Sequence, residues 1–304
     1  MTDSRLVDCN GETTFECMPS FGNGKHRSES IRMETFEATI IAKGAPVKTS
    51  DGHRVMCAIA VSRDYGLVRF YPLDVLDEVR VWSQIEVVAR RSNKDNRRES
   101  WRVTKSVHIS DIKDRDARID LLDACVLHSG TKDPIKYQNE NQASICVVKP
   151  HGHVGVALEP RDKDDHCVHD PEETWVYTQD EMPFKPYITW TSVQEGKHKS
   201  HVVAQEVYVG MLNNSSSPMR VFENMRVGDP DYQHWLVLGN LKDRRNVWVV
   251  PHLHRFKKTD MRTRSSLLTS NGSGDAWPYL TQEAINAKDA GPQMMLPFIT
   301  SFTE

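Results

Sequence analysis

Short apolar runs alternate with polar turns along most of the chain, and this pattern predicts a protein built mainly from β-strands. The clearest example is the stretch 54–103, where runs rich in Val, Ile, Phe and Tyr are separated by Asp64-Tyr65-Gly66 and by a polar connection. We expect these runs to pair as an antiparallel meander. The three predicted strands of this stretch are 54–62, 67–72 and 82–90, and residues 95–103 close it.

The rest of the first half adds one strand and one helix to this prediction. Residues 35–42 read as a first strand, and residues 43–53, which hold Gly44, Pro46 and Asp51-Gly52, indicate a turn region. Ser110 can cap a helix over 111–126, because apolar residues recur there at helical spacing. These apolar residues are Ile112, Ile119, Leu122 and Cys125.

The second half repeats this mixture of several strands and one helix. Ser200 can cap a helix that ends near Leu212. Gly239 and Asn240 tolerate positive φ and suit a tight turn or a bulge between the last two strands. The predicted strands of this half are 143–148, 154–158, 184–193, 235–238 and 246–250.

A polar connection over 128–142, which contains Gly130 and Pro134, separates the two halves. We therefore predict two domains, 34–135 and 143–260, each β-rich with an accessory helix. Residues 1–33 lack periodicity and predict a flexible extension, and residues 261–304 form a tail.

The composition limits the class of protein but does not indicate a reaction. The chain has 304 residues, 38% of them hydrophobic, and a formal net charge of −3, so any surface for a polyanion must be local. No run approaches the roughly 18 apolar residues that span a bilayer, and no signal peptide opens the chain, so we expect a cytoplasmic protein without membrane contact. The six cysteines include no Cys-x-x-Cys pair and indicate reduced thiols.

Two basic tracts are the main functional signal. The first basic tract, residues 90–105, has seven Lys or Arg against two Asp or Glu; the second, residues 242–264, has eight against two. Cations and aromatic rings on a small sheet are typical of surfaces that bind phosphates and stack bases, so we predict a partner in nucleic acid. The predicted contacts are Arg69, Tyr71, Arg90, Arg91, Lys94, Arg97, Arg98, Trp101, Arg102, Lys242, Arg244, Arg245, Lys257 and Lys258.

Two of these predictions have a structural alternative. Alternation along a strand puts Asp95, Arg97 and Glu99 on one face, where an ion pair that fixes the strand end competes with phosphate binding. Tyr71 and Phe70 point to opposite faces of a strand, and core packing of both is as plausible as stacking of one on a base.

Several phrases of the chain resemble a family of bacterial and phage-associated proteins described as dual OB-domain proteins. The first half carries Val68-Arg-Phe-Tyr-Pro72 and the signature Asp95-x-Arg97-x-Glu99-Ser100, and the second half carries Pro183-Phe-Lys-Pro-Tyr187 and Leu238-Gly-Asn240. The resemblance implies two consecutive OB-like β-barrels and a place in a genome-maintenance or defence assembly. It implies no activity, and Ala204-Gln205-Glu206 departs from the Asp-Trp pair that such sequences carry before the Glu.

Candidate metal ligands are present without a recognised spacing. One set comprises His151, His153, His166, Cys167, His169 and Asp170. A second comprises His198, His201 and Glu206. Phosphate-loop, nucleophile-elbow and dinucleotide motifs are missing, so we predict a protein without catalytic residues, cofactor or bound metal. This prediction favours a binding protein over an enzyme.

Three hypotheses follow from the sequence. The first is a protein that binds single-stranded or unwound nucleic acid. The second is an adaptor subunit that docks on a protein partner through the acidic segment 159–181, which has nine acidic residues against two basic ones. The third is a metal-dependent phosphodiesterase that uses the His- and Asp-rich residues.

Overall fold

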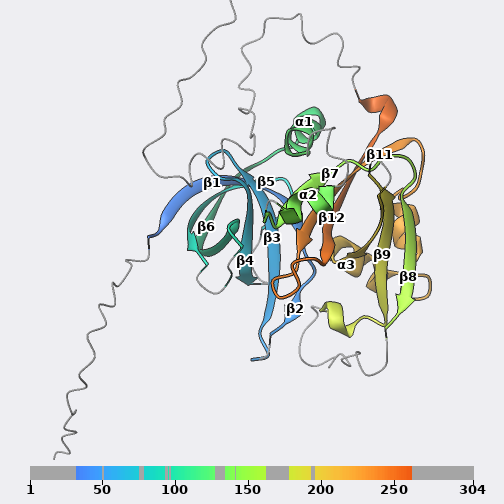
Figure 1. The fold of residues 1–304 in the computed structure, drawn as a ribbon, viewed down its shortest axis with the longest axis horizontal. Helices are drawn as coiled ribbons and strands as arrows, with labels where there is room; N and C mark the ends of the chain where they lie inside the picture. Colours follow the sequence, from blue (N-terminus) through green and yellow to red (C-terminus); the bar gives the residue numbers. More distant parts are fainter. Residues whose placement is uncertain are drawn as a thin grey trace, which may run out of the picture. The chain divides into compact units, whose positions relative to one another are not determined.

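The computed structural model describes residues 32–49, 51–74, 79–92, 95, 97–126, 134–140, 142–161, 178–192 and 196–261. These residues form a mainly β protein with two six-stranded sheets (Figure 1). No helix among them is long and apolar enough to cross a bilayer. Lys94, residues 166–170 and the tail from residue 262 lie outside the described residues.

The first sheet closes into a barrel of five strands. Its order is β1-β5-β6-β4-β3-β2, and β1 also pairs with β3. All pairs are antiparallel except β4 with β6. Of the predicted meander, the antiparallel pairing of β3 with β4 is confirmed, whereas the pairing of β4 with β5 is wrong, because β6 lies between them. The strands are β1 Glu34–Lys43, β2 Val47–Lys48, β3 Arg54–Ser62, β4 Gly66–Asp74, β5 Ser83–Arg91 and β6 Ser100–Asp111.

The second sheet follows the same order of pairing, with its first strand split in two. Its order is β7-β11-β12-β10-β9-β8, and β10 pairs with β12 in parallel. The split follows Lys149 and contains Pro150, which lacks an N–H donor, and Gly152, which has a φ of 75°. The strands are β7 Ile145–Val148, β8 Gly155–Pro160, β9 Phe184–Thr191, β10 Lys197–Val202, β11 Tyr232–Asn240 and β12 Trp248–Lys257.

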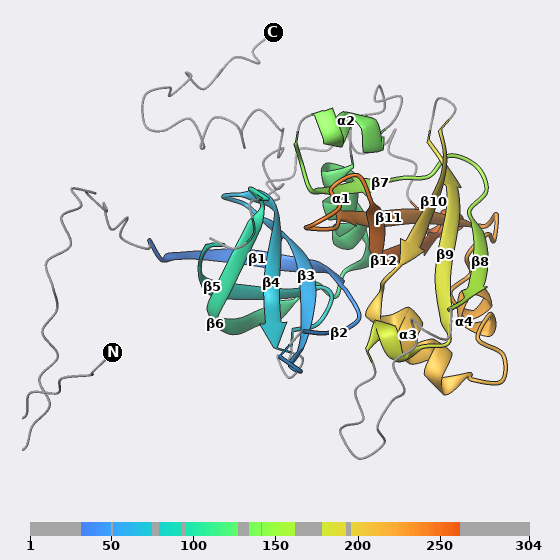
Figure 2. The same cartoon turned by 60° about the horizontal axis from the view of Figure 1, so that its bottom comes forward.

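Both sheets have the connection of an OB barrel, in which the third and fifth long strands pair in parallel. In the first barrel those strands are β4 and β6, and in the second they are β10 and β12. Figure 2 shows the two sheets side by side. The predicted fold class, mainly β with two OB-like barrels and accessory helices, is confirmed.

In the described ranges, four α-helices accompany the sheets: α1 Arg115–Cys125, α2 Pro134–Glu140, α3 Gln205–Asn213 and α4 Arg220–Asn224. Short 3-10 helices lie at Gln179–Glu181 and Lys258–Asp260. The α1 and α3 helices start later than predicted, because Ser110 and Ser200 belong to β6 and β10. Asp114 instead caps α1 by accepting a hydrogen bond from the Ala117 N–H at 2.7 Å.

The two sheets share one apolar cluster in addition to the core inside each barrel. Outward residues of the first barrel, among them Ile41 and Ile59, pack with Leu122 of α1 and with Val147 and Trp235 of the second sheet. The strands of the first sheet end at Asp111 and those of the second begin at Ile145. The contact between the barrels is thus built from buried apolar side chains, which usually fixes the relative position of two layers.

Candidate nucleic-acid interface

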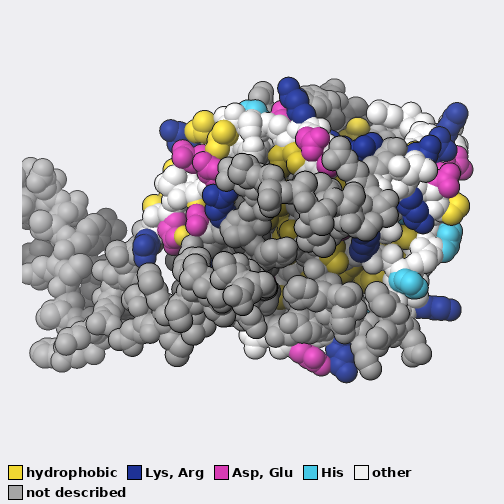
Figure 3. Space-filling view, turned by 90° about the horizontal axis from the view of Figure 1, so that it is seen from above, with side chains coloured by type: hydrophobic (Ala, Val, Ile, Leu, Met, Phe, Trp, Pro, Cys, Tyr) yellow, Lys and Arg dark blue, Asp and Glu magenta, His cyan; other side chains and the backbone are white. Residues whose placement is uncertain are grey.

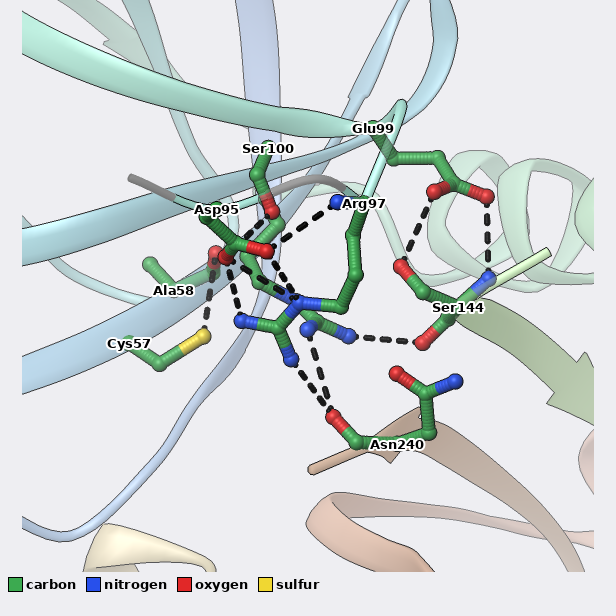
Figure 4. Close-up of polar contacts among 9 residues, drawn as sticks. Cys57, Ala58, Asp95, Arg97, Glu99, Ser100, Ser144 and Asn240 are labelled. Carbon is green, nitrogen blue, oxygen red and sulfur yellow. Dashed lines mark hydrogen bonds and ion pairs between the residues drawn. The ribbon is translucent and has the colours of Figure 1, made fainter. Parts of the chain in front are cut away.

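A buried ion pair occupies the loop between β5 and β6 of the first barrel (Figure 4). The Arg97 guanidinium donates from Nε to Asp95 Oδ1 at 2.8 Å and from Nη2 to Asp95 Oδ2 at 2.5 Å. Ser100 Oγ donates to the same carboxylate at 2.9 Å. Only 6% of the Arg97 side chain and 3% of the Asp95 side chain are exposed. The ion-pair alternative from the sequence is therefore confirmed.

The same loop is bonded to the second sheet. Arg97 Nη1 donates to the Asn240 carbonyl at 2.7 Å, and Arg69 donates to the carbonyls of Asn240 at 3.2 Å and Ser144 at 2.6 Å. Glu99 accepts from Ser144 N and Oγ at 3.0 and 2.9 Å. We call Arg69, Asp95, Arg97 and Glu99 the inter-barrel latch, because their side chains fasten the first barrel to the second.

The latch and the core of the first barrel remove several predicted contacts from the surface. Arg69, Arg97 and Trp101 are 2%, 6% and 0% exposed, so none of them reaches a nucleic-acid strand in this conformation. The Arg91 guanidinium lies 4.1 Å from the centre of the Trp101 ring, and Arg98 Nε lies 3.7 Å from Glu99 Oε1. These cations already have partners within the protein.

Tyr71 is partly buried beside the latch, and burial raises the pKa of its hydroxyl. Of the first basic tract, Arg90, Arg102 and Lys105 point outward from the barrel, because they lie on the face of β5 and β6 that is opposite to the core residues Val87 and Ala89.

The second barrel presents a different surface on β9 and β10, the second and third long strands of its OB connection. Tyr187 lies on the outer face with Lys185 on the same strand, because Ile188 and Trp190 occupy the inner face. Lys199 of β10 places Nζ 4.7 Å from the centre of the Tyr187 ring and also contacts the Glu159 carboxylate. Lys197 is exposed on the same side of β10.

The loop over residues 241–247 joins β11 to β12 and carries the start of the second basic tract. Lys242 and Arg244 are exposed, and Arg245 is partly buried. Since His201 of β10 lies beside Val249 of the parallel β12, the loop enters β12 near the end of β10. Its base is Asn240, the residue whose carbonyl accepts from the latch.

Lys257 and Lys258 do not join this surface. Lys257 ends β12, nine residues after Trp248, so the strand separates it from the loop by roughly 30 Å. The second basic tract is therefore divided between opposite ends of one strand. On the face shown in Figure 3, Lys and Arg side chains stand among Asp and Glu side chains rather than in one continuous patch.

The sequence predictions did not include Lys185, Tyr187, Lys197 and Lys199 as contacts. The signal for them is alternation, because Lys185-x-Tyr187 and Lys197-x-Lys199 each put two such residues on one side of a strand. A count of charge over a window does not detect this arrangement, since β9 has only one Lys or Arg and β10 only two.

His201 stands next to Tyr187 on this surface without adding charge at neutral pH. Burial, with Arg161 and Lys185 nearby, lowers the pKa of His201 to about 4, and its Nε2 lies 3.1 Å from the Tyr208 hydroxyl. The ring centres of His201 and Tyr187 are 5.4 Å apart. His201 therefore supports the Tyr187 ring as a neutral aromatic group.

The candidate metal ligands are not assembled in the described part of the chain. His198 stacks on Trp190 at 4.0 Å between ring centres, and Glu206 Oε1 lies 2.9 Å from His252 Nδ1. No group of three His, Cys, Asp or Glu side chains there is arranged to hold a metal ion. His151 and His153 lie in the split between β7 and β8, and His201 lies beside the Tyr208 hydroxyl. The other predicted ligands, within residues 166–170, fall outside the described residues.

Comparison with known proteins finds one family model that matches the first barrel. The model of a domain of unknown function (DUF8758) matches residues 34–123, which hold the first barrel and most of α1. None of the curated proteins compared by sequence matches the chain.

Solved structures to which the chain is similar include the p204 HINb domain, with 10% identity and a TM-score of 0.30. That match covers 75% of this chain and 99% of that chain. A murine DNA-binding protein bound to double-stranded DNA has 9% identity, a TM-score of 0.28 and coverage of 76% and 99%. The tetrameric p202 HIN2 has 8% identity, a TM-score of 0.26 and coverage of 75% and 95%. Likeness at this level does not assign a ligand to the chain.

Proposed function

We propose that this protein binds single-stranded or unwound nucleic acid on the second barrel, across the outer face of β9 and β10 and the loop 241–247. The observation that carries the proposal is the placement of Lys185, Lys197 and Lys199 on the same outer face as Tyr187, with Lys199 over its ring. The neighbouring β12 is entered from a loop that exposes Lys242 and Arg244. OB barrels bind oligonucleotides on this pair of strands and on the loop between their last two strands.

The chemistry of these groups fits a strand rather than a duplex groove. A base stacked on an aromatic ring contributes roughly 1–3 kcal/mol, and cations along the strand path neutralise phosphates. Lys199 already lies over Tyr187 and contacts Glu159. A phosphate that replaces Glu159 as the partner of Lys199 leaves the Tyr187 ring available to a base.

Fluorescence anisotropy with labelled oligo(dT) at several salt concentrations tests the proposal. Tyr187→Ala is expected to weaken binding by roughly 1–3 kcal/mol, while Tyr187→Phe keeps the ring and retains most of the affinity. The logarithm of the affinity should fall linearly with the logarithm of the salt concentration. Weak binding that ignores salt, or equal affinities for the two Tyr187 variants, argues against the proposal.

We also propose that the chain acts within a bacterial or phage genome-maintenance or defence assembly. This context rests on the resemblance of the Asp95-x-Arg97-x-Glu99-Ser100 and Pro183–Tyr187 phrases to dual OB-domain proteins. Affinity purification of the tagged full chain from its native host, with and without nuclease, tests it. Recovery of genome-maintenance or defence proteins supports the context, and recovery of the chain alone contradicts it.

A further inference from the structure

The outer face of β1, β5 and β6 on the first barrel carries charges in an unusual order. Arg90 of β5 lies directly opposite Arg102 of β6, and Glu37 of β1 lies directly opposite Glu86 of β5. Like charges on directly opposite residues of a sheet destabilise it. This face contains two such pairs, one of each sign.

The geometry of the sheet places the two pairs close together on one side. Arg90, Val88 and Glu86 alternate along β5 with the core residues Val87 and Ala89, so all three point outward. Val88 lies opposite Lys105, and Glu86 lies opposite Val107. Along the strands, the outer face therefore has cations at one end and Val88 in the middle. At the other end it has the two carboxylates and Val107.

These side chains are available to a partner. Glu37, Glu86, Arg102 and Lys105 are exposed, and Val107 is 48% exposed. Within the described part of the chain, no ion pair engages the five charged side chains of this face. Within a single chain, the repulsion between the like charges of this face is therefore not compensated by an ion pair.

We propose that this face binds a second copy of the same chain in a twofold dimer. A twofold axis near Val88 places the Arg90 and Arg102 pair of each copy against the Glu37 and Glu86 pair of the other, with apolar side chains between them. Such an interface is self-complementary, because each pair meets its opposite twice. A polyanion would match the cations alone and would be repelled by Glu37 and Glu86.

Charge-swap variants of the full chain test the dimer by sedimentation velocity. The wild-type chain is expected to sediment as a dimer at about 0.15 M salt and to dissociate as salt rises. Arg90→Glu with Arg102→Glu, and separately Glu37→Lys with Glu86→Lys, should each raise the dimer dissociation constant roughly 100-fold. An equimolar mixture of the two variants should restore dimers, and Lys242→Glu with Arg244→Glu should leave the wild-type dimer unchanged.

The outcomes separate the dimer from other uses of the face. A monomeric wild-type chain at high protein concentration overturns the proposal, and so does a mixture of variants that stays monomeric. If the wild-type chain is monomeric and the Arg90→Glu, Arg102→Glu variant loses affinity for oligo(dT), the face is assigned to nucleic acid instead. If either double variant fails to fold, Val107→Asp on the same face replaces it, and a dimer that survives Val107→Asp contradicts the proposal.

Discussion

The loop between β5 and β6 and the loop between β11 and β12 occupy the same place in two barrels of the same connection, and both belong to basic tracts. In the first loop, Arg97 is buried against Asp95 and bonds to the second barrel. In the second loop, Lys242 and Arg244 are exposed. The difference depends on a neighbouring carboxylate, because Asp95 and Glu99 give the first loop acceptors that turn its arginine inward, whereas residues 241–247 contain only Asp243.

The comparison also shows that the two loops depend on each other. Arg69 and Arg97 both donate to the carbonyl of Asn240, the residue that precedes the second loop. The inter-barrel latch therefore holds the base of the loop whose cations we assign to phosphate binding. We infer that the first barrel supports the interface and the second barrel forms it.

Removing the latch arginine should produce the largest effect. Arg97→Ala leaves Asp95 buried without its partner, and breaking a buried ion pair on one side costs about 3–5 kcal/mol. Chemical denaturation should show this loss in the free energy of unfolding. Arg244→Ala, the matched change in the other loop, should alter it by less than about 0.5 kcal/mol. Equal effects of the two changes would remove the distinction between the loops.

Acidification should change the protonation of buried residues of the second barrel and should not change that of its loop cations. The pKa of His201 is about 4 in the folded chain and near 6.5 when unfolded, so the unfolded state binds more protons between these values. The free energy of unfolding should therefore fall as pH drops from about 6.5 to 4, by roughly 3 kcal/mol for this group. Burial lowers the pKa values of His234 and His254 as well, with the same sign.

The check is denaturation at several pH values. His201→Gln should flatten part of the dependence, because glutamine does not take up a proton. A wild-type chain with constant stability over this range is incompatible with a buried neutral His201.

Reversing charge in the second loop should have an intermediate effect, confined to binding. Lys242→Glu with Arg244→Glu is expected to lower oligo(dT) affinity about tenfold. The salt slope, which is the slope of the logarithm of affinity against the logarithm of salt concentration, should decrease in magnitude by about 1.4, or about 0.7 for each lost phosphate contact. Anisotropy titrations measure both. The stability of the variant should stay at the wild-type value, since both side chains are exposed. A wild-type salt slope in this variant would exclude the loop from the interface.

The smallest effect is expected at the other end of β12. Lys257→Ala with Lys258→Ala should change oligo(dT) affinity less than about twofold, because these residues lie roughly 30 Å from the loop 241–247. The same titration serves as the assay. An effect as large as that of the loop variant would show that the second basic tract acts as one surface.

Much of the fold could be predicted from the sequence, because alternating apolar residues mark each strand irrespective of its neighbours. The order of the strands could not, since the position of β1 between β3 and β5 depends on barrel closure. Ser110 and Ser200 illustrate a local limit: each has the residue type of a helix cap, yet Ser200 accepts from Trp190 Nε1 within the barrel at 3.2 Å.

The candidate site was harder to predict for the same reason. Charge density identified both basic tracts but not the direction of their side chains, and the partners of Arg69 and Arg97 come from Ser144 and Asn240, which are far away in sequence. Lys199 was missed because strand pairing, not sequence proximity, brings it to Tyr187. Lys185 lies two residues from Tyr187 on β9 and was missed because a single cation does not stand out in a count of charge.

Hydrogen exchange of the wild-type chain, with and without oligo(dT), tests the contrast between the loops most directly. We expect the amides of residues 241–247 and of β9 and β10 to become protected on binding, while the amides of residues 97–100 are already protected in the free chain and do not change. Protection that appears at 97–100 and leaves 241–247 unaffected would contradict the assignment of the latch to the first barrel and the interface to the second.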